Sequence, residues 1–362
     1  MAEPAEISVP RIRLAHGGGG TLMQQLIDGE LRRLYEDPGQ VLHDAARLAL
    51  PHGRLAFTTD SYVVQPLEFE GGDIGSLAVT GTANDLAMAG ARPLVLSLGL
   101  ILEEGLELAV LRRIVNSLAA TARQCGMAIV TGDTKVVERG KGDGIFINTS
   151  GIGVLEAVEP IDPLAIVPGD QLLVSGDLGR HGVAILAARH GLDLQPPLAT
   201  DCMPLWPAVE ALLAAEVRLH CLRDLTRGGL ASALLELAAP NALELRIEEA
   251  CLPVAEPVRR SCDLLGFDPL QMANEGRFLA VVPAADRERA LAVLAPGGGA
   301  WIGEVTGEVT GAVTGAVTWA VTWAGDTESP GGRSPGRVVL RTPFGSERLL
   351  VPLSGELLPR IC

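Results

Sequence analysis

Apolar runs alternate with amphipathic stretches along the first half of the chain. The short apolar runs predict strands at residues 55–58, 76–79, 94–102, 127–131 and 145–154. The pattern predicts a long helix over 106–126, and a shorter helix that begins at Asp85 with Asn84 as its N-cap. Strands and helices that alternate in this way are typical of an α/β domain, which we place at residues 1–155.

The second half of the chain repeats this alternation. A turn at Val167–Asp170 precedes a predicted strand over 171–175 and a predicted helix over 182–188. Further strand and helix patterns follow. We therefore expect a second α/β domain over residues 156–345 and a flexible C-terminal tail over residues 346–362.

One segment of the second domain has low complexity. From Gly303 the sequence runs GEVT, GEVT, GAVT, GAVT, WAVT and WAGD, and this period of four matches neither a helix nor a strand. A stretch rich in Gly, Ser and Pro follows it. We interpret residues 303–336 as an insertion that enlarges a surface loop, or a loosened hairpin, between two strands.

Composition and charge narrow the class of protein. The 362 residues are 48% hydrophobic, which suffices for the cores of two domains. A net charge of -15 repels nucleic acid and anionic lipid, so we expect neither as a partner. The chain has no apolar run of about 18 residues and no signal-peptide pattern at its start, which favours a cytoplasmic protein. Its six cysteines form no CxxC pair, unlike those of a zinc site.

Four aspartates follow predicted strands in motifs rich in Gly, Thr and Asn. They are Asp60, Asp85, Asp133 and Asp224. Ligands of open α/β folds bind beyond the carboxyl ends of the strands. A single aspartate there is usually a turn former or a helix cap. Four of them indicate a site where carboxylates hold Mg²⁺, which would bridge them to a triphosphate.

A run of glycines near the start is a candidate phosphate site. His16 is followed by Gly17, Gly18, Gly19 and Gly20, and a helical pattern begins directly after the run. Backbone N–H groups of such a run can approach phosphates at a helix N-terminus. No GK[ST] follows, so the run is not a Walker motif. A flexible N-terminal linker is the alternative interpretation.

Two further charged residues could take part in chemistry. Lys135 follows Asp133 closely, and could pair with carboxylates or hold a phosphate oxygen. Glu275 lies in the sequence MANEGR, where Gly276 allows a close approach. It could be a metal ligand, a general base or a capped surface group.

The C-terminal sequence GELLPRIC ends on Cys362. Pro359 prevents a helix from continuing to the end, so the last residues should be extended and mobile. An exposed terminal thiol is easily oxidised. A nucleophile at the end of a mobile arm therefore favours a carrier of a covalently bound group over an accidental cysteine. Arg360 could pin this tail to a carboxylate.

These motifs resemble, in order and along nearly the whole chain, the HypE family of carbamoyl dehydratases, which help to mature nickel–iron hydrogenases. The motifs are HGGGG, TDSYVV, GTANDLA, ILEEGL, GDTKVV, RDLTRGG, ANEG and the terminal PRIC. Several of them also occur in a wider ATP-binding superfamily that includes aminoimidazole ribonucleotide synthetase and selenophosphate synthetase, whereas PRIC is specific. The resemblance implies two α/β (α+β) domains, a homodimer whose N-terminal domains build a β-barrel, and ATP in a cleft bordered by both domains.

The resemblance also implies roles for residues. ATP and Mg²⁺ would be bound by Gly17–Gly20, Asp60, Asn84, Asp85, Asp133 and Asp224, with the four aspartates as metal ligands. The chemistry itself needs a cation at the transferring phosphoryl group and a base at the amide nitrogen, and Lys135 and Glu275 are our candidates for these two roles. Cys362 would accept a carbamoyl group from a partner carbamoyltransferase. After dehydration, the cyanide would pass to iron on a scaffold complex of two other maturation proteins.

Two other functions stay open. A small-molecule kinase or synthetase of the superfamily would not need PRIC, and a selenophosphate synthetase should carry a reactive cysteine near the glycine run, whereas the first cysteine here is Cys125. A non-catalytic carrier would present Cys362 without turning over ATP. The intact acidic motifs and Lys135 argue against such a carrier.

Overall fold

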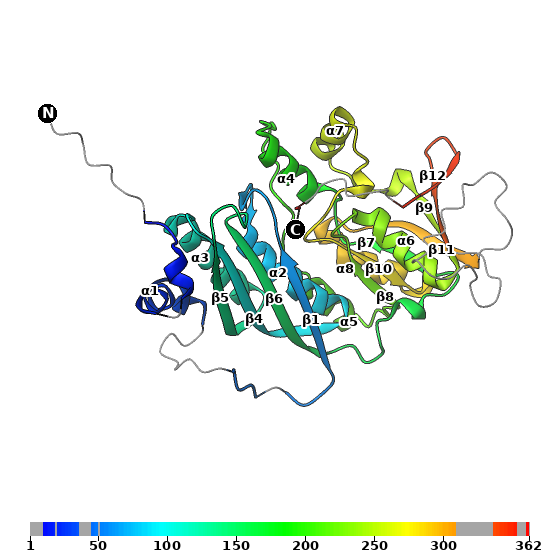
Figure 1. The fold of residues 1–362 in the computed structure, drawn as a ribbon. Coiled ribbons are helices and arrows are strands. Elements are labelled where there is room, and N and C mark those ends of the chain that lie inside the picture. The colour runs from blue at the N-terminus through cyan, green and yellow to red at the C-terminus, as the bar shows by residue number, and fades with distance from the viewer. Residues whose placement is uncertain are drawn as a thin grey trace, which may run out of the picture. The chain divides into compact units, whose positions relative to one another are not determined.

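The chain forms two compact units, which are considered separately below (Figure 1). The computed structural model describes residues 10–18, 20–35, 45–49, 51–308, 336–352 and 360–361. The first unit comprises Met1–Leu86, Ala91–Leu155 and Arg360–Cys362, and the second comprises Ala87–Gly90 and Glu156–Pro359. The C-terminal end of the chain thus groups with the N-terminal unit.

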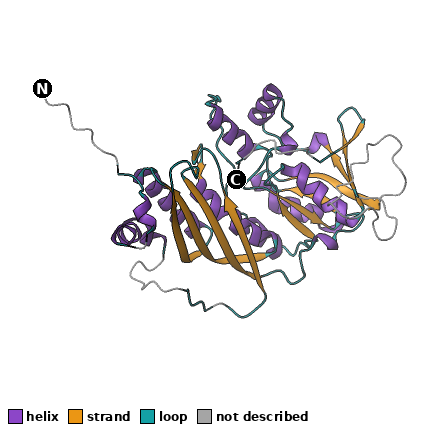
Figure 2. Ribbon diagram, viewed as in Figure 1, coloured by secondary structure: helices purple, strands orange, loops and turns teal. Residues whose placement is uncertain are grey.

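The first unit is built on a four-stranded sheet with the order β1-β6-β4-β5 (Figure 2). Its strands are β1 (Leu55–Tyr62), β4 (Ala91–Glu103), β5 (Ala128–Val137) and β6 (Ile145–Leu155). Strands β4 and β5 are parallel, and the other pairs are antiparallel. Smaller elements are a short helix at Leu14–Gly17, α1 (Thr21–Leu26), short helices at Ile27–Leu31 and Arg32–Leu34, and the pair β2 (Glu68–Phe69) and β3 (Gly72–Asp73).

Helix α3 (Leu108–Gln124) and all but the last two residues of helix α2 (Ile74–Met88) belong to the same unit, and α2 covers one face of the sheet. A Cβ added to Gly151 of β6 would meet Thr82 and Leu86 of α2. The opposite face carries exposed apolar side chains, with Phe57 70% and Ile101 42% exposed. The sheet of this unit therefore has one covered face and one open face.

The start of α2 differs from the prediction. Residues 76–79, expected to be a strand, lie in this helix, and Asn84 is an interior residue of the helix and not its N-cap. The helix begins early because Asp73 Oδ1 accepts the N–H groups of Gly75 and Ser76 at 2.7 and 2.9 Å. The residues that follow are buried all round, so their apolar run could not distinguish a strand from a helix.

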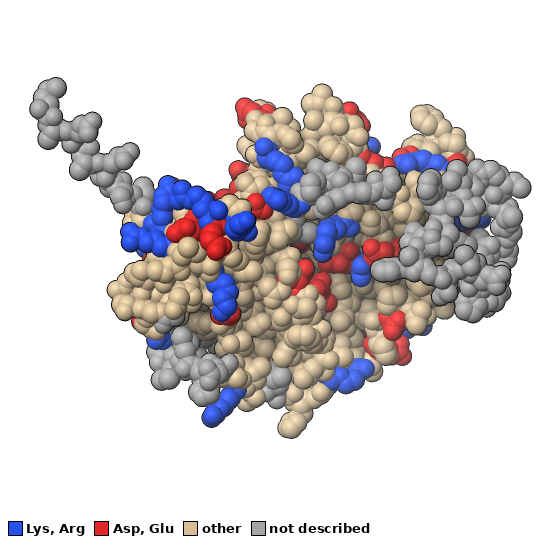
Figure 3. Space-filling model, in the orientation of Figure 1, with Lys and Arg blue, Asp and Glu red and all other residues tan. Residues whose placement is uncertain are grey.

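Ion pairs attach the short helices after the glycine run to α3. Arg112 donates to Glu30 at 2.5 Å, and Arg33 lies 3.4 Å from the same carboxylate. The Arg112 guanidinium holds the pKa of Glu30 below its ordinary value. On the face seen in Figure 3, basic and acidic side chains lie beside one another in this region.

The second unit is built on a seven-stranded sheet with the order β13-β12-β9-β11-β7-β10-β8. Its strands are β7 (Gln171–Val174), β8 (Cys221–Asp224), β9 (Leu243–Glu248), β10 (Phe278–Val282), β11 (Ala300–Glu308), β12 (Arg337–Arg341) and β13 (Glu347–Leu349). Its helices are α4 (Arg180–His190), α5 (Trp206–Ala214), α6 (Gly229–Asn241), α7 (Glu256–Leu265) and α8 (Arg287–Leu294), with short helical turns at Pro163–Ala165, Glu249–Cys251, Pro269–Gln271, Ala284–Asp286 and Ala295–Gly297.

Both faces of this second sheet are covered. Leu172 and Val174 of β7 pack in a core with residues of α6, whereas Leu173 between them packs in a second core with residues of α5 and α8. Every residue of β7 is accordingly buried. A strand buried on both faces appears in the sequence as a continuous apolar run, which is why this strand was predicted correctly.

The structure corrects two expectations for the C-terminal part. Strands β11 and β12 flank the low-complexity insertion, but both pair with β9 and not with each other, so these two strands do not form a hairpin. Residues 303–308 extend β11, and residues 309–335 lie outside the described residues. Strand β13 lies within the predicted flexible tail, because its backbone pairs with β12. Among the described residues, no helix is long and apolar enough to cross a membrane.

Candidate active site

In the first unit, Asp60 and Asp85 lie on the same face of the sheet. Asp60 is inside β1, not beyond it, and its register partner is Thr149, which is fully buried. Asp85 lies in the last turn of α2, and Thr58 Oγ1 donates to its Oδ2 at 2.8 Å. Because side chains alternate along a strand, Thr58 and Asp60 both point to the face that α2 covers.

Asp133 faces the opposite side of the sheet. It lies inside β5 and pairs in register with Gly99 of β4, which pairs with Asn148 of β6. Asn148 precedes the buried Thr149 and donates to Ser61 Oγ at 2.9 Å on the open face. Asp133 is therefore not brought together with Asp60 and Asp85 in this chain. No group of three His, Cys, Asp or Glu that could hold a metal occurs in the described part of the chain.

Lys135 forms an exposed ion pair with Asp133. Its Nζ lies 2.8 Å from Asp133 Oδ2 and 2.9 Å from Oδ1. The ammonium holds the pKa of the Asp133 carboxyl below its ordinary value. The two side chains are 66% and 68% exposed, and pairs of this kind contribute about 0–1 kcal/mol to stability. Either partner can therefore exchange the other for a ligand at little cost.

The glycine run lies beside the same strand. Gly17 ends a short helix, and a Cβ at this position would meet the backbone nitrogen of Val136 at 3.0 Å. Gly20 is the N-cap of α1, and Gln24 N–H donates to its carbonyl at 3.1 Å. Gly18 is the C-cap of the short helix, and Gly19 lies outside the described residues. The fold thus brings the glycine run next to the strand that carries Asp133 and Lys135.

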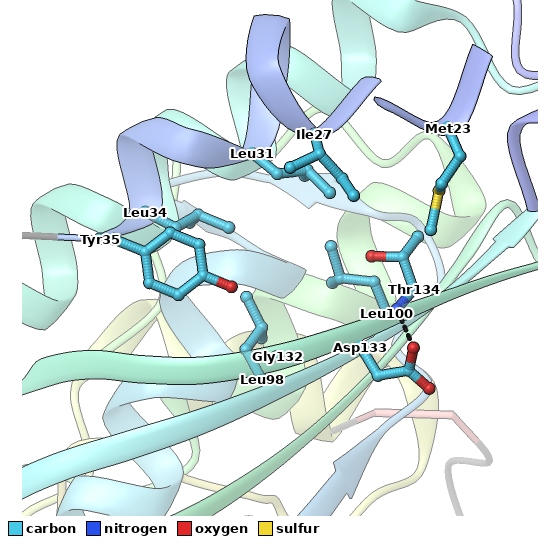
Figure 4. Close-up of a pocket in the computed structure, with 10 residues that line it drawn as sticks. All are labelled: Met23, Ile27, Leu31, Leu34, Tyr35, Leu98, Leu100, Gly132, Asp133 and Thr134. Atoms are coloured by element: carbon cyan, nitrogen blue, oxygen red, sulfur yellow. Dashed lines mark hydrogen bonds between the residues drawn. The ribbon is translucent and has the colours of Figure 1, made fainter. Parts of the chain in front are cut away.

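A small cavity opens between this helical segment and the sheet (Figure 4). Its volume is about 100 Å³, and its lining residues are Met23, Ile27, Leu31, Leu34, Tyr35, Leu98, Leu100, Gly132, Asp133 and Thr134. Pockets that enclose a molecule of nucleotide size span about 300–1,000 Å³. The cavity is too small for a whole nucleotide and has mainly apolar walls, and the carboxylate of Asp133 points away from the helical side chains that line it (Figure 4).

In the second unit, Asp224 and the ANEG segment lie at adjacent strand ends. Asp224 is the last residue of β8 and pairs in register with Phe278, the first residue of β10. The N–H of Leu225 donates to the carbonyl of Arg277 at 3.1 Å. Since Glu275 comes only three residues before Phe278, this pairing brings the two acidic motifs of the unit to one end of the sheet.

Asn274 fixes the ANEG segment. Its Oδ1 accepts the N–H of Gly179 at 2.6 Å, and its Nδ2 donates to the carbonyls of Leu225 and Met272, both at 3.1 Å. The side chain is almost fully buried. One amide thus ties the turn before α4, the end of β8 and the ANEG segment together.

Glu275 is a buried residue, only 3% exposed. Its N–H donates to Asp201 Oδ1 at 3.2 Å. The interpretation of Glu275 as a capped surface group is therefore wrong, while a general base and a metal ligand stay predictions. The next residue must be glycine, because a Cβ at Gly276 would lie 1.9 Å from the carbonyl oxygen of Asp201.

The end of the C-terminal tail is docked on the first unit. Arg360 Nη1 lies 2.7 Å from Asp143 Oδ2, and the N–H of Gln65 donates to the carbonyl of Arg360 at 3.1 Å. Ile361 is buried, with 4% exposure. The residues next to Cys362 are thus not mobile as expected, although Cys362 itself lies outside the described residues. Asp143 was not identified from the sequence, where it is one acidic residue in a glycine-rich loop.

Comparison with known proteins places the chain in a class and then in a family. Models of the AIR synthase related protein match it twice, with the N-terminal domain at residues 42–155 and the C-terminal domain at residues 167–316. It is thus a two-domain protein of the AIR synthase type. Carbamoyl dehydratase HypE of Azotobacter vinelandii is 46% identical over 357 residues, which cover 97% of each chain. The chain belongs to the carbamoyl dehydratase HypE family.

Solved structures agree with this assignment. A crystal structure of the hydrogenase maturation protein HypE in complex with ATP is 44% identical, with a TM-score of 0.86 and coverage of 96% of this chain and 99% of that chain. HypE in a crystal structure of a HypE–HypF complex is 36% identical, with a TM-score of 0.73 and coverage of 92% and 99%. These matches confirm the family resemblance and the two-domain α/β fold.

Proposed function

We propose that this chain is an ATP-dependent carbamoyl dehydratase that converts a carbamoyl group on Cys362 into a thiocyanate. The cyanide would become a ligand of the iron in a nickel–iron hydrogenase. The observation that carries the proposal is the docked end of the tail, where Arg360 is held by Asp143 and Ile361 is buried. A kinase of small molecules has no use for such a tail. The full-length similarity to a protein named carbamoyl dehydratase supports the same conclusion.

The reaction must make a poor leaving group into a good one. The carbamoylated thiol is S–C(=O)–NH₂, and its oxygen leaves poorly as hydroxide. Transfer of the γ-phosphoryl group of ATP to that oxygen releases ADP. Loss of both nitrogen protons and departure of the oxygen as part of phosphate then give S–C≡N. The overall reaction converts the carbamoyl thiol and ATP into thiocyanate, ADP and phosphate. The elements of water that the carbamoyl group loses are therefore found in the ADP and phosphate formed from ATP.

In the first unit, we assign the phosphates to the glycine run. Phosphoryl transfer depends mainly on positioning and on neutralising charge. Backbone N–H groups of Gly17–Gly20 would bind phosphate oxygens. Lys135 faces away from Asp60 and Asp85 in this chain, so it stays a prediction as the cation on the transferring phosphoryl group; its high exposure would make the exchange of Asp133 for a phosphoryl oxygen easy.

Asp60 and Asp85 fit a Mg²⁺ ion on ATP. This ion usually takes one or two carboxylates, with phosphate oxygens and waters as its other ligands, so a pair of aspartates on one face is a sufficient donor set. When bound, Mg²⁺ neutralises charge on the phosphates. Asn84, Asp133 and Asp224 stay predictions as further groups that bind the nucleotide or its metal.

In the second unit, we assign the general base to Glu275. A general base must be held within hydrogen-bonding distance of the proton that it removes. The bonds of Asn274 and the contact of Gly276 with Asp201 restrict the backbone on both sides of Glu275. Burial keeps water away from a carboxylate that would remove the protons of the carbamoyl nitrogen.

The proposal also implies partners. A HypE has been crystallised with HypF, which supports a carbamoyltransferase of that type as the donor for Cys362. A scaffold complex of two further maturation proteins would accept the cyanide. The open sheet face with Phe57 and Ile101 supports a homodimer through the first unit. We place these encounters in the cytoplasm.

The mass of the C-terminal peptide tests the function. The protein is incubated with a HypF-type carbamoyltransferase, carbamoyl phosphate and ATP. A dehydratase gains one carbamoyl group on Cys362 and then loses one water only when ATP is present. Carbamoylation without loss of water would leave a carrier, and no modification at all would favour a small-molecule kinase. Deletion of the last residues separates these cases further, because a kinase keeps its ATP turnover.

A further inference from the structure

One motif of the sequence, ILEEGL, has no part in the proposed chemistry. It contains Glu103, the last residue of strand β4. The carboxylate of Glu103 binds both ends of the loop that follows β5. Its Oε1 accepts the N–H of Gly140 at 2.5 Å, and its Oε2 accepts the N–H of Gly144 at 3.0 Å. The backbone N–H of Glu103 also donates to the carbonyl of Gly144 at 2.8 Å, so one residue makes three hydrogen bonds to this loop.

The loop over residues 138–144 is rich in glycine and needs contacts from outside to take one conformation. Its sequence is ERGKGDG, in which Gly140 and Gly144 have φ angles of +79° and +88°. Glycine adopts this region readily but populates many others as well, so fixing such a loop is costly in entropy. Hydrogen bonds to a charged carboxylate are stronger than those between neutral groups. The bonds of Glu103 therefore select one conformation of the loop.

This loop forms one side of the site where the C-terminal tail is docked. Asp143 Oδ2 lies 2.7 Å from Arg360 Nη1, and the Asp143 side chain is 23% exposed. Gln65 lies on the other side of the site, and its N–H donates to the carbonyl of Arg360 at 3.1 Å. The two sides touch, because a Cβ added to Gly144 would lie 3.1 Å from Leu67 Cδ1. All of these residues belong to the first unit.

The docked tail depends on more than its ion pair. Arg360 has a φ of +56°, a conformation that residues other than glycine rarely adopt. Such a conformation persists only where the surroundings fix it. The next residue, Ile361, is buried. The site thus binds a cationic side chain, a backbone carbonyl and an apolar side chain together, and a misplaced Asp143 would weaken it.

We propose that Glu103 is a positioning residue for the C-terminal tail: it fixes the loop over residues 138–144 so that Asp143 can bind Arg360. Glu103 acts through Asp143 and takes no part in the chemistry. Its importance for the reaction rests on the proposed dehydratase function, in which this tail carries the carbamoyl group. The ILEEGL motif then serves to hold the part of the chain that bears the substrate.

The variant Glu103→Gln tests the proposal. Its amide oxygen can accept one N–H of the loop, but its NH₂ group faces the other N–H, so one end of the loop is released. The undocked fraction of the tail should rise about two- to fivefold. A larger rise is not expected, because the Asp143–Arg360 pair is partly exposed, and such a pair changes an equilibrium by no more than about fivefold.

Cleavage by trypsin after Arg360 measures the undocked fraction. Trypsin must take the arginine side chain into its own pocket, so it cannot cleave while Asp143 holds that side chain. When docking is fast relative to cleavage, the rate follows the undocked population. Mass spectrometry of the full chain detects the loss of Ile361 and Cys362. Cleavage at the wild-type rate in Glu103→Gln would overturn the proposal.

Hydrogen exchange in the same variant locates the effect. The amides of Gly140 and Gly144 should exchange faster, because one of their bonds to Glu103 is lost. The amide of Gln65 should also exchange faster, because its acceptor is the carbonyl of Arg360. Faster exchange at the glycines with wild-type exchange at Gln65 would show that the loop does not hold the tail, and would overturn the role of Glu103.

Glu104→Gln is the matched control. Glu104 is the neighbouring residue of the same motif, and its Oε1 accepts the N–H of Leu14 in the N-terminal segment at 3.5 Å. We expect cleavage after Arg360 and exchange at Gln65 as in the wild type. Equal acceleration in both variants would show that any change in this motif loosens the tail, which would contradict a specific role of Glu103.

The double variant of Glu103→Gln with Asp143→Asn separates positioning from general support of the fold. If Glu103 acts through Asp143, the double variant should be cleaved no faster than Asp143→Asn alone. If the effects of the two changes multiply instead, Glu103 stabilises the first unit independently of the ion pair, and the proposal is wrong.

These measurements need neither ATP nor a carbamoyl donor, so they separate this proposal from the proposed function. A wild-type protein that is carbamoylated but never loses water would overturn the dehydratase, even if Glu103 holds the tail. Unchanged cleavage in Glu103→Gln would overturn the role of Glu103 and leave the dehydratase intact. Faster cleavage in Glu103→Gln, absent from Glu104→Gln and not additive with Asp143→Asn, is the result that supports Glu103.

Discussion

Each unit contains a pair of ionisable residues that includes a residue of the proposed chemistry, and the two pairs differ in burial. Asp133 and Lys135 are both about two-thirds exposed and bind each other. Asp201 and Glu275 are at most 5% exposed and are fixed by backbone contacts. An exposed ion pair contributes little and exchanges partners readily, whereas two buried carboxyl groups held by backbone contacts are costly to desolvate and rigid. The first suits a phosphate that comes and goes, and the second suits proton removal from a positioned group.

The largest effect is expected for Glu275→Gln. The loss of a general base should slow dehydration by about a thousandfold, while carbamoylation of Cys362 and ATP binding continue. Single-turnover mass spectrometry of the C-terminal peptide measures this. Since the buried charge is removed, the protein should not lose stability. Dehydration within tenfold of the wild type would show that the base is another group.

Lys135→Ala should have the next largest effect on the reaction. The loss of one cation at the phosphates should slow ATP-dependent dehydration about 10- to 100-fold. The free energy of unfolding should change by less than about 1 kcal/mol, because the pair with Asp133 is exposed. Chemical denaturation and single-turnover rates measure the two quantities. A large loss of stability together with a normal dehydration rate would show that the Asp133–Lys135 pair supports the fold and not the reaction.

Gly276→Ala tests whether the backbone next to the buried Glu275 is as tightly packed as the comparison requires. Its Cβ would lie 1.9 Å from the carbonyl of Asp201, so the ANEG segment must shift, at a cost of about 1–3 kcal/mol or more. The matched control is Gly29→Ala, where an added Cβ meets nothing within 4 Å. Thermal unfolding should show a lower midpoint for the first variant and a nearly unchanged midpoint for the second. Equal midpoints would argue against the close contact.

The smallest effect is expected for Asp143→Asn, which removes the ion pair with Arg360. Arg360 is 56% exposed, so the loss of stability should be under about 1 kcal/mol. The tail should be cleaved faster by a protease, and dehydration should fall a few-fold because Cys362 is held less often. Replacement of the exposed Asp193 by Asn serves as the control. Unchanged cleavage would show that the ion pair does not hold the tail.

The sequence predicted the elements whose patterns are local. The continuous apolar run of β4 and the amphipathic pattern of α3 gave their strands and helix nearly in full. The prediction for the start of α2 failed because Leu77, Ala78 and Val79 are all buried, so the apolar positions there show no helical period.

Contacts between distant segments could not be predicted. The face to which Asp133 points depends on strand register, which a one-residue shift would reverse. The bond between Asp201 and Glu275 joins residues far apart in the chain, and Asp201 stands in no recognisable motif. For the Arg360–Asp143 pair, the sequence predicted only that Arg360 binds a carboxylate, and not which one. In each case the sequence shows which residue types are present, whereas tertiary packing determines which residue each of them contacts.

The fate of the carbamoyl oxygen tests the central claim most directly. Cys362 is carbamoylated with a group whose carbonyl oxygen is ¹⁸O, and the protein is then given unlabelled ATP in ordinary water. If ATP makes the oxygen leave as phosphate, the label appears in inorganic phosphate, with one labelled oxygen for each thiocyanate formed. Label in water, with none in phosphate, would contradict phosphorylation of the carbamoyl group and with it the proposed use of ATP.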